Sequence, residues 1–121
     1  MKATKPQDIR KRTFQFSVDV VNLCRAHESA SSSTRVVSNQ LLRAATSIGA
    51  NVEEAYGGQS PADFASKMGI ACKEAPETRY WIRLAEACEL FRSGSLAALD
   101  SESHELVAIL TAIAKKYRTN S

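Results

Sequence analysis

Apolar residues recur at steps of three and four residues through most of the chain, the spacing that places them on one face of an α-helix. Four stretches show this spacing, and they predict helices over about residues 6–27, 34–56, 61–93 and 99–118. No stretch alternates between apolar and polar residues with the period of two that a half-buried strand requires. The pattern therefore predicts an all-α protein that forms a single domain over residues 1–121.

Polar and glycine-containing breaks separate the four stretches. The serine-rich segment 27–34 follows the first, and Ser33 or Thr34 can cap the second helix. Residues 57–58 are both glycine and stop the second helix, while Gly94 lies in the third break. Because long helices joined by short loops pack against their neighbours in opposite directions, the sequence predicts an up-down-up-down antiparallel four-helix bundle.

The first and third predicted helices each carry a second apolar stripe besides the one that a bundle core needs. These second stripes consist of Phe14, Val18 and Val21 in the first helix and of Ile70, Trp81, Leu84 and Cys88 in the third. The first of them lies about 150° from its core stripe at 100° per residue. A helix with two apolar faces is buried on two sides, so we expect self-association into a ring-like homo-oligomer. The alternative is one wide apolar stripe inside a monomer.

Charged residues in the third helix bear on the same question. Arg79 and Arg83 flank Trp81, so they either pair across subunits or form a solvated, salt-bridged face. We adopt the first interpretation. The expected oligomer interface then comprises Phe14, Val18, Val21, Arg79, Trp81, Arg83 and Leu84.

The net charge of +3 is unevenly distributed, because both ends of the chain are basic. In an up-down bundle the start of the first helix and the end of the fourth lie at one end of the molecule. We therefore expect a basic end there, with acidic residues at the other end, among them Glu102 and Glu105. The expected nucleic-acid-binding residues are Arg10, Lys11, Arg12, Lys115, Lys116 and Arg118. The alternative is that charged termini only keep the protein soluble.

Enzymatic chemistry has little support in the sequence. His27 and His104 are the only histidines, and two such residues near a bundle end form a metal site far less often than a solvated surface. No spacing matches a di-iron bundle or a phosphate loop. We therefore expect no enzyme activity, catalytic residue, cofactor or metal. The N-terminus lacks a signal-peptide pattern and no apolar run is long enough for a membrane span, so we expect a cytoplasmic protein with no membrane partner.

Three segments carry a resemblance to a known family. They read NQLLRAATSIGANVEEA, ADFASKMGIACKEAPETRYWIRLAEA and LVAILTAIAKKY. From about Phe14 to Tyr117 the chain resembles the bacterial four-helix-bundle proteins that are also called 23S ribosomal RNA intervening-sequence proteins. The resemblance implies a four-helix bundle and a ring of five identical chains. It also suggests a likeness to the basic, barrel-shaped accessory protein of diversity-generating retroelements.

One residue departs from the family pattern, because Pro76 stands where the family has a non-proline residue. A proline inside a helix removes one hydrogen bond and crowds the carbonyl four residues earlier, so we expect a kink. Taken together, the sequence predicts a non-enzymatic homo-oligomer that binds RNA through its basic end. The alternative function is a protein-interaction scaffold or accessory subunit without direct contact to nucleic acid.

Overall fold

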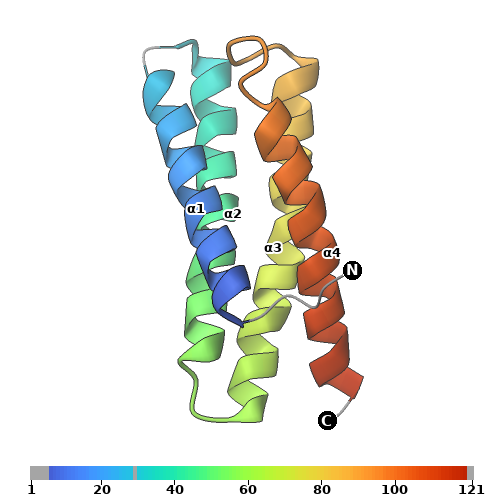
Figure 1. The fold of residues 1–121 in the computed structure, drawn as a ribbon. Helices are drawn as coiled ribbons and strands as arrows, with labels where there is room; N and C mark the ends of the chain where they lie inside the picture. The colour runs from blue at the N-terminus through green and yellow to red at the C-terminus, as the bar shows by residue number, and fades with distance from the viewer. Residues whose placement is uncertain (1–5, 29, 120–121) are drawn as a thin grey trace.

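The computed structural model describes residues 6–28 and 30–119, and within them the chain forms four α-helices and no strand. The helices are α1 (Pro6–Ala26), α2 (Ser32–Tyr56), α3 (Pro61–Ala87) and α4 (Ala97–Thr119). They run alternately up and down and lie side by side along one long axis (Figure 1). The prediction of an all-α protein with four helices is confirmed.

Capping side chains define where α2 and α3 begin. The hydroxyl of Ser31 accepts a hydrogen bond from the Thr34 N–H, so α2 starts two residues earlier than predicted and Ser33 lies inside it. The hydroxyl of Ser60 accepts from the Asp63 N–H at 3.1 Å, and Pro61 occupies the first helical position. Both arrangements satisfy amides that a helix start otherwise leaves unpaired.

The end of α3 differs from the prediction, which extended this helix to residue 93. The helix ends at Ala87, because Glu89 adopts a left-handed φ of 53°. The N–H groups of Glu89 and Leu90 then bond to the carbonyls of Glu86 and Ala85 at 3.1 and 3.0 Å. This pair of bonds is a Schellman motif, whose left-handed position usually holds glycine. No sequence signal marks this stop, because the position holds glutamate instead of glycine.

Pro76 lies within α3 on its exposed side, and the helix continues through it. Proline has no N–H, so the Cys72 carbonyl lacks its helical donor at this point. The helix therefore continues past Pro76, and the expected kink stays a prediction.

The core runs along the bundle axis and receives apolar side chains from all four helices. Its largest fully buried apolar members are Ile9, Phe16, Val20, Leu41, Ile48, Val52, Met68, Ile82, Leu106 and Leu110. Two buried threonines, Thr13 and Thr78, donate their hydroxyls to carbonyls of their own helices at 2.8 Å. Their polar groups are therefore satisfied without leaving the core.

Small residues let α1 approach α2 closely. Gly49 is buried, and a Cβ atom added there would lie 3.0 Å from the Ser17 hydroxyl and 3.2 Å from the Thr13 carbonyl oxygen. Glycine is a poor helix former, but at position 49 it is tolerated because its lack of a side chain lets α1 pack closely against α2.

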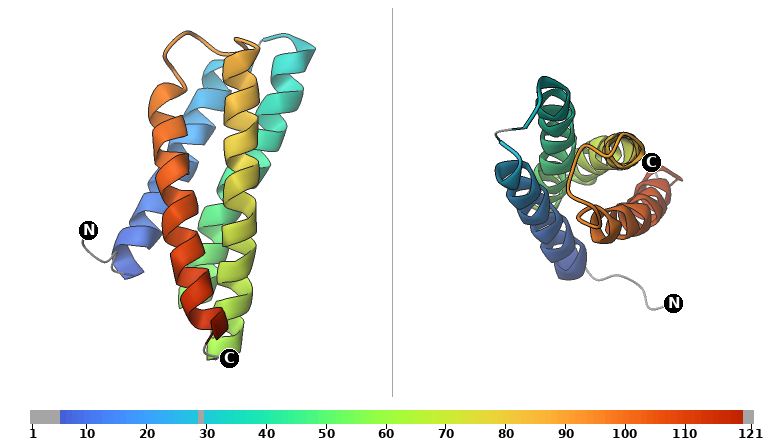
Figure 2. Two further views of the ribbon diagram at one scale, coloured as in Figure 1. Left: turned by 90° about the vertical axis from the view of Figure 1, so that its right-hand side faces the viewer. Right: turned by 90° about the horizontal axis from the view of Figure 1, so that it is seen from above.

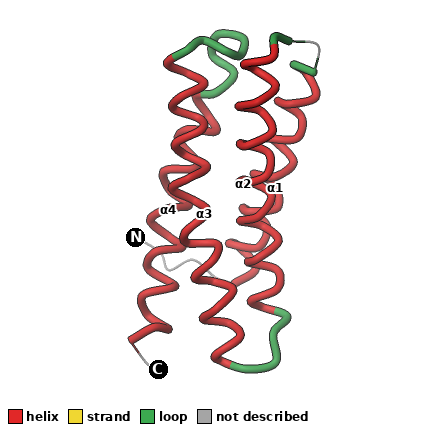
Figure 3. The backbone as a smooth tube through the Cα atoms, turned by 180° about the vertical axis from the view of Figure 1, so that it is seen from behind, coloured by secondary structure: helices red, strands yellow, loops and turns green. Residues whose placement is uncertain are grey.

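The helices do not pack evenly. α1 lies mainly against α2, and α4 lies mainly against α3, while α1 and α4 touch much less. Figure 2 shows α1 inclined away from the other helices towards its N-terminus. In the view from behind in Figure 3, α1 lies beside α2 and α4 beside α3, while α2 and α3 make the most extensive contact. This inclination decides which charged side chains of α1 and α4 can meet.

Candidate interaction surfaces

Arg10 of α1 is held by a carboxylate of α2. Its Nε and Nη2 atoms donate to Glu53 Oε1 and Oε2 at 3.3 and 2.9 Å. This two-point hydrogen bond raises the pKa of Arg10 and lowers the pKa of Glu53. Both side chains are exposed, so the pair stays in contact with solvent while its charges offset each other.

Arg12 contacts α4 in a way that the sequence analysis did not predict. Its Nε and Nη2 atoms donate to Glu102 at 3.0 and 2.6 Å, and Nη2 lies 3.6 Å from Glu105. The hydrogen bond to Glu102 raises the pKa of Arg12. The expectation that Glu102 and Glu105 lie at the opposite end from Arg12 is wrong, because the inclined α1 carries Arg12 towards the first half of α4.

The basic residues of α4 lie further along the same helix. Lys115 and Lys116 follow Glu105 by ten or more residues, about 15 Å at the rise of an α-helix. Both are exposed, as is Lys11 on α1. The side chain of Arg118 falls outside what the structure describes. Of the expected six residues, Arg12 therefore lies in a separate group with acidic partners, apart from Lys115 and Lys116.

Aromatic side chains connect Arg10 with the end of α4. The Arg10 guanidinium lies 5.9 Å from the ring centre of Tyr56, and the Tyr56 and Phe64 rings meet edge-on at 5.0 Å. The ring centres of Phe64 and Tyr117 lie 4.4 Å apart, and the Lys116 ammonium lies 6.0 Å from the centre of the Tyr117 ring. We call these five residues the basic aromatic end. Sequence reasoning missed Tyr56 and Phe64, which become its neighbours only when the α2–α3 turn folds against α4.

A surface between α1 and α2 contains two hollows, which together we call the α1–α2 groove. The lower hollow has a volume of about 260 Å³ and is lined by Phe14, Ser17, Thr46, Gly49, Ala50 and Glu53. The upper hollow has a volume of about 210 Å³ and is lined chiefly by Val21, Cys24, Arg25, Arg35, Ser38 and Leu42. Phe14 is 65% exposed, whereas Val18 and Val21 are half-buried. Of the second stripe of α1, only Phe14 therefore faces outwards, while Val18 and Val21 are partly covered.

The predicted interface residues of α3 divide into two groups. Trp81 and Leu84 are half-buried and pack against the core of their own chain. Arg79 Nε lies 3.8 Å from Asp100 Oδ1 of α4, and both atoms are buried, so Arg79 connects two helices of one chain. Arg83 is exposed.

Tyr80 and Ile70 are the large apolar residues that α3 exposes among those described, at 57% and 40%. Tyr80 contacts Trp81 edge-on at 5.1 Å. The expected interface set does not include Tyr80, which lies outside both apolar stripes of α3.

The two histidines differ in their surroundings. His27 Nδ1 lies 2.9 Å from the Leu23 carbonyl oxygen, and His27 Nε2 accepts a hydrogen bond from the Arg92 N–H at 3.3 Å. Its ring also meets Phe91 edge-on at 4.8 Å. These contacts join the end of α1 to the loop before α4. His104 is exposed. Within residues 6–28 and 30–119 no group of three or more His, Cys, Asp and Glu side chains is arranged to hold a metal ion.

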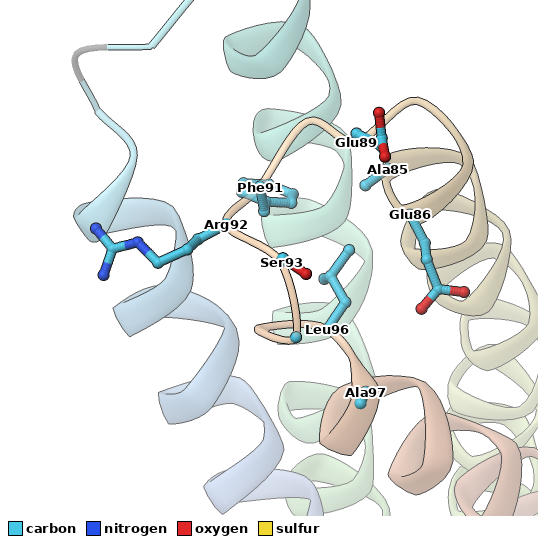
Figure 4. Close-up of a pocket in the computed structure, with 9 residues that line it drawn as sticks. Ala85, Glu86, Glu89, Phe91, Arg92, Ser93, Leu96 and Ala97 are labelled. Carbon is cyan, nitrogen blue, oxygen red and sulfur yellow. The ribbon is translucent and has the colours of Figure 1, made fainter.

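A further pocket of about 310 Å³ lies between the end of α3 and the start of α4 (Figure 4). Its lining includes Glu86, Glu89, Phe91 and Leu96, and the side chain of Arg92 points away from it. The lining combines two carboxylates with apolar side chains and a serine.

No helix in the described part of the chain is long and apolar enough to cross a membrane.

Comparison with known proteins gives a consistent result. The family model described as 23S rRNA-intervening sequence protein matches residues 5–112. The chain is also similar to a crystal structure from Bacteroides thetaiotaomicron, described as a protein with unknown function from the S23 ribosomal protein family. The two share 36% sequence identity and a TM-score of 0.79 over 91% of this chain and 97% of the other. No curated protein matches the chain.

Proposed function

The chain belongs to the 23S rRNA-intervening sequence protein family, and from that premise we propose that it is a non-enzymatic protein that assembles with copies of itself into a closed ring of five. The observation that carries this proposal is the exposure of large apolar side chains on two different faces. Phe14 lies beside the α1–α2 groove, and Tyr80 and Ile70 project from α3. A ring requires two distinct surfaces on each subunit, because each copy contacts one neighbour with each surface.

Native mass spectrometry tests this assembly. At micromolar concentration we expect one closed oligomer of five chains. Phe14→Ser with Tyr80→Ser should dissociate it into folded monomers, because both side chains lie outside the core. Val36→Ser is a suitable control, since Val36 is equally exposed but lies at the start of α2. A parent protein that stays monomeric at this concentration would refute the proposal.

We further propose that the basic aromatic end, together with Lys11 and Lys115, contacts RNA. Support comes from the exposed lysines, from the aromatic rings between the basic groups, and from the description of the family as 23S rRNA-intervening sequence proteins. Lysine and arginine contact phosphates, and exposed rings can stack on bases. In a ring, all copies of this end lie on one face, which strengthens their combined field. We place this activity in the cytoplasm, where free thiols such as those of Cys24, Cys72 and Cys88 remain reduced.

The rival function, a scaffold that binds only protein, is favoured by the pairing of Arg10 and Arg12 with carboxylates. An arginine that already holds a carboxylate offers less to a phosphate than an unpaired one. Salt-dependent binding to RNA separates the two functions.

A further inference from the structure

We propose that Glu53 competes with RNA phosphate for the Arg10 guanidinium, so that the Arg10–Glu53 ion pair restrains RNA binding at the basic aromatic end. This inference rests on the RNA contact proposed above and assigns the residue that regulates it. Three observations carry it, namely the geometry of the pair, its exposure to solvent, and the aromatic ring that holds Arg10 independently of the carboxylate.

The Glu53 carboxylate occupies the position that a phosphate would take on Arg10. Arg10 Nε and Nη2 donate to its two oxygens at 3.3 and 2.9 Å, which is the parallel two-point contact of a guanidinium with an oxyanion. Arginine binds the oxygens of a phosphate with the same fork of donors. A phosphate that approached the other donors of Arg10 instead would meet the negative charge of the carboxylate. Glu53 and a phosphate therefore exclude each other from Arg10.

The pair lies at the surface, where one anion can replace another. The side chains of Arg10 and Glu53 are 44% and 49% exposed, and ion pairs in such positions are weak because water and salt screen them. Arg12 differs, because it contacts both Glu102 and Glu105 and is only 32% exposed. Of the two arginines, Arg10 is therefore the one that a phosphate recruits more readily.

Tyr56 holds the Arg10 guanidinium independently of Glu53. The guanidinium lies 5.9 Å from the centre of the Tyr56 ring, and this ring packs against the core and meets Phe64 edge-on. A cation over an aromatic ring keeps this attraction whichever anion it binds. Release of Glu53 therefore leaves Arg10 positioned beside the rings of the basic aromatic end.

Anion exchange, rather than protonation, makes Arg10 available at neutral pH. The hydrogen bond from Arg10 lowers the pKa of Glu53, so the carboxylate stays charged. The stabilisation from the pair is present above the ordinary carboxyl pKa and is lost only as the pH falls through the lowered value. A strand that is already bound through neighbouring basic residues brings its phosphates close to Arg10 and competes with Glu53 at a high effective concentration.

Neutralisation of Glu53 tests the competition. Glu53→Gln should bind a single-stranded RNA of uniform sequence about two- to fivefold more tightly than the parent at low salt, the range that corresponds to one exposed ion pair. Glu54→Gln is the matched control, because it removes the same charge from the next position, where the carboxylate lies 3.7 Å from Lys67 of α3. It should change the affinity by less than about 1.5-fold, since Glu54 is paired with Lys67 and not with Arg10.

Arg10→Gln in two backgrounds completes the test. It should weaken RNA binding more in Glu53→Gln than in the parent, because only there does Arg10 lack its competing carboxylate, and the two substitutions are then not additive. Glutamine removes a charge that the helix dipole disfavours near the end of α2, so the variant should keep its fold. Circular dichroism checks this, and Glu53→Ala gives a second neutral variant with the same expected result.

The outcomes are distinguishable. Equal affinities of Glu53→Gln and Glu54→Gln, or equal losses on Arg10→Gln in the two backgrounds, would overturn the competition while the RNA contact stands. Native mass spectrometry should show the same oligomer for all variants, and a changed oligomer for Glu53→Gln would assign the pair to a subunit contact and overturn the inference. If neither the parent nor Glu53→Gln binds RNA at low salt, the proposed RNA contact fails as well.

Discussion

The close approach of α1 to α2 depends on one residue, Gly49. A mid-helix glycine costs roughly 0.5–1 kcal/mol relative to alanine, so an alanine is expected to stabilise a helix wherever there is room for its methyl group. At Gly49 that methyl group would meet the Thr13 backbone carbonyl at 3.2 Å. At Gly69 of α3 a methyl group would meet nothing within 4 Å. The same substitution therefore has different surroundings at the two positions.

We expect Gly69→Ala to raise the free energy of unfolding by about 0.5–1 kcal/mol. We expect Gly49→Ala to be less stable than Gly69→Ala by at least about 1 kcal/mol, because α1 must move away from α2. Urea unfolding of both variants beside the parent measures this difference. Equal stabilisation by the two substitutions would show that α1 does not need the close contact at Gly49.

Single residues also show where sequence reasoning stops. Ile9, Phe16 and Val20 recur at steps of seven and four residues, which places them on one face of a helix, and all three are buried. The partner of Arg12 could not be predicted in the same way, because its contact with Glu102 depends on the inclination of α1. An inclination results from the packing of all side chains at the helix contact, and no local pattern records it. The approach of Tyr56 to Phe64 likewise arises only from tertiary structure.

At the scale of helices, the starts were easier to predict than the end of α3. Pro61 after a serine is a recognised start signal, and the structure uses both residues. The stop at Ala87 depends on a left-handed glutamate, a conformation that costs a residue with a Cβ roughly 1–2 kcal/mol. Glycine would adopt it with little strain, and Gly94 in the following loop does so with a φ of 84°. The residue type at position 89 therefore gives no sign of the left-handed backbone conformation that follows the end of α3.

This strain leads to a prediction for the end of α3. Glu89→Gly should raise the free energy of unfolding by about 1 kcal/mol, because the Schellman motif then carries its favoured residue. Gly94→Ala is the opposite control and should lower it by a similar amount, since alanine is strained at positive φ. Thermal unfolding followed by circular dichroism measures both. A lower melting temperature for Glu89→Gly would mean that the glutamate side chain makes a stabilising contact that outweighs the strain.

At the scale of the whole molecule, the charge arrangement is less polarised than the sequence suggested. Arg10 and Arg12 are paired with acidic residues, which offset part of the positive charge that the sequence places at this end. The aromatic rings beside Arg10 and Lys116 add flat apolar surface to this end. Tyr117 is 38% exposed and is thus accessible to a base from solvent. Phosphate contact should therefore dominate RNA binding, with a smaller contribution from stacking.

Binding to a single-stranded RNA of uniform sequence, measured over a range of salt concentrations, tests this expectation. The logarithm of the association constant should fall linearly with the logarithm of the salt concentration, by about 0.7 for each phosphate contacted. Lys115→Gln with Lys116→Gln should weaken binding and reduce that slope, because two phosphate contacts per subunit are lost, while native mass spectrometry shows an unchanged oligomer. Lys73→Gln with Arg92→Gln removes the same charge elsewhere on the molecule and should leave the slope close to that of the parent. If both double variants change the slope equally, only the net charge matters and the basic aromatic end is not a site. If the parent binds no RNA even at low salt, the protein-binding scaffold is the better account of this family member.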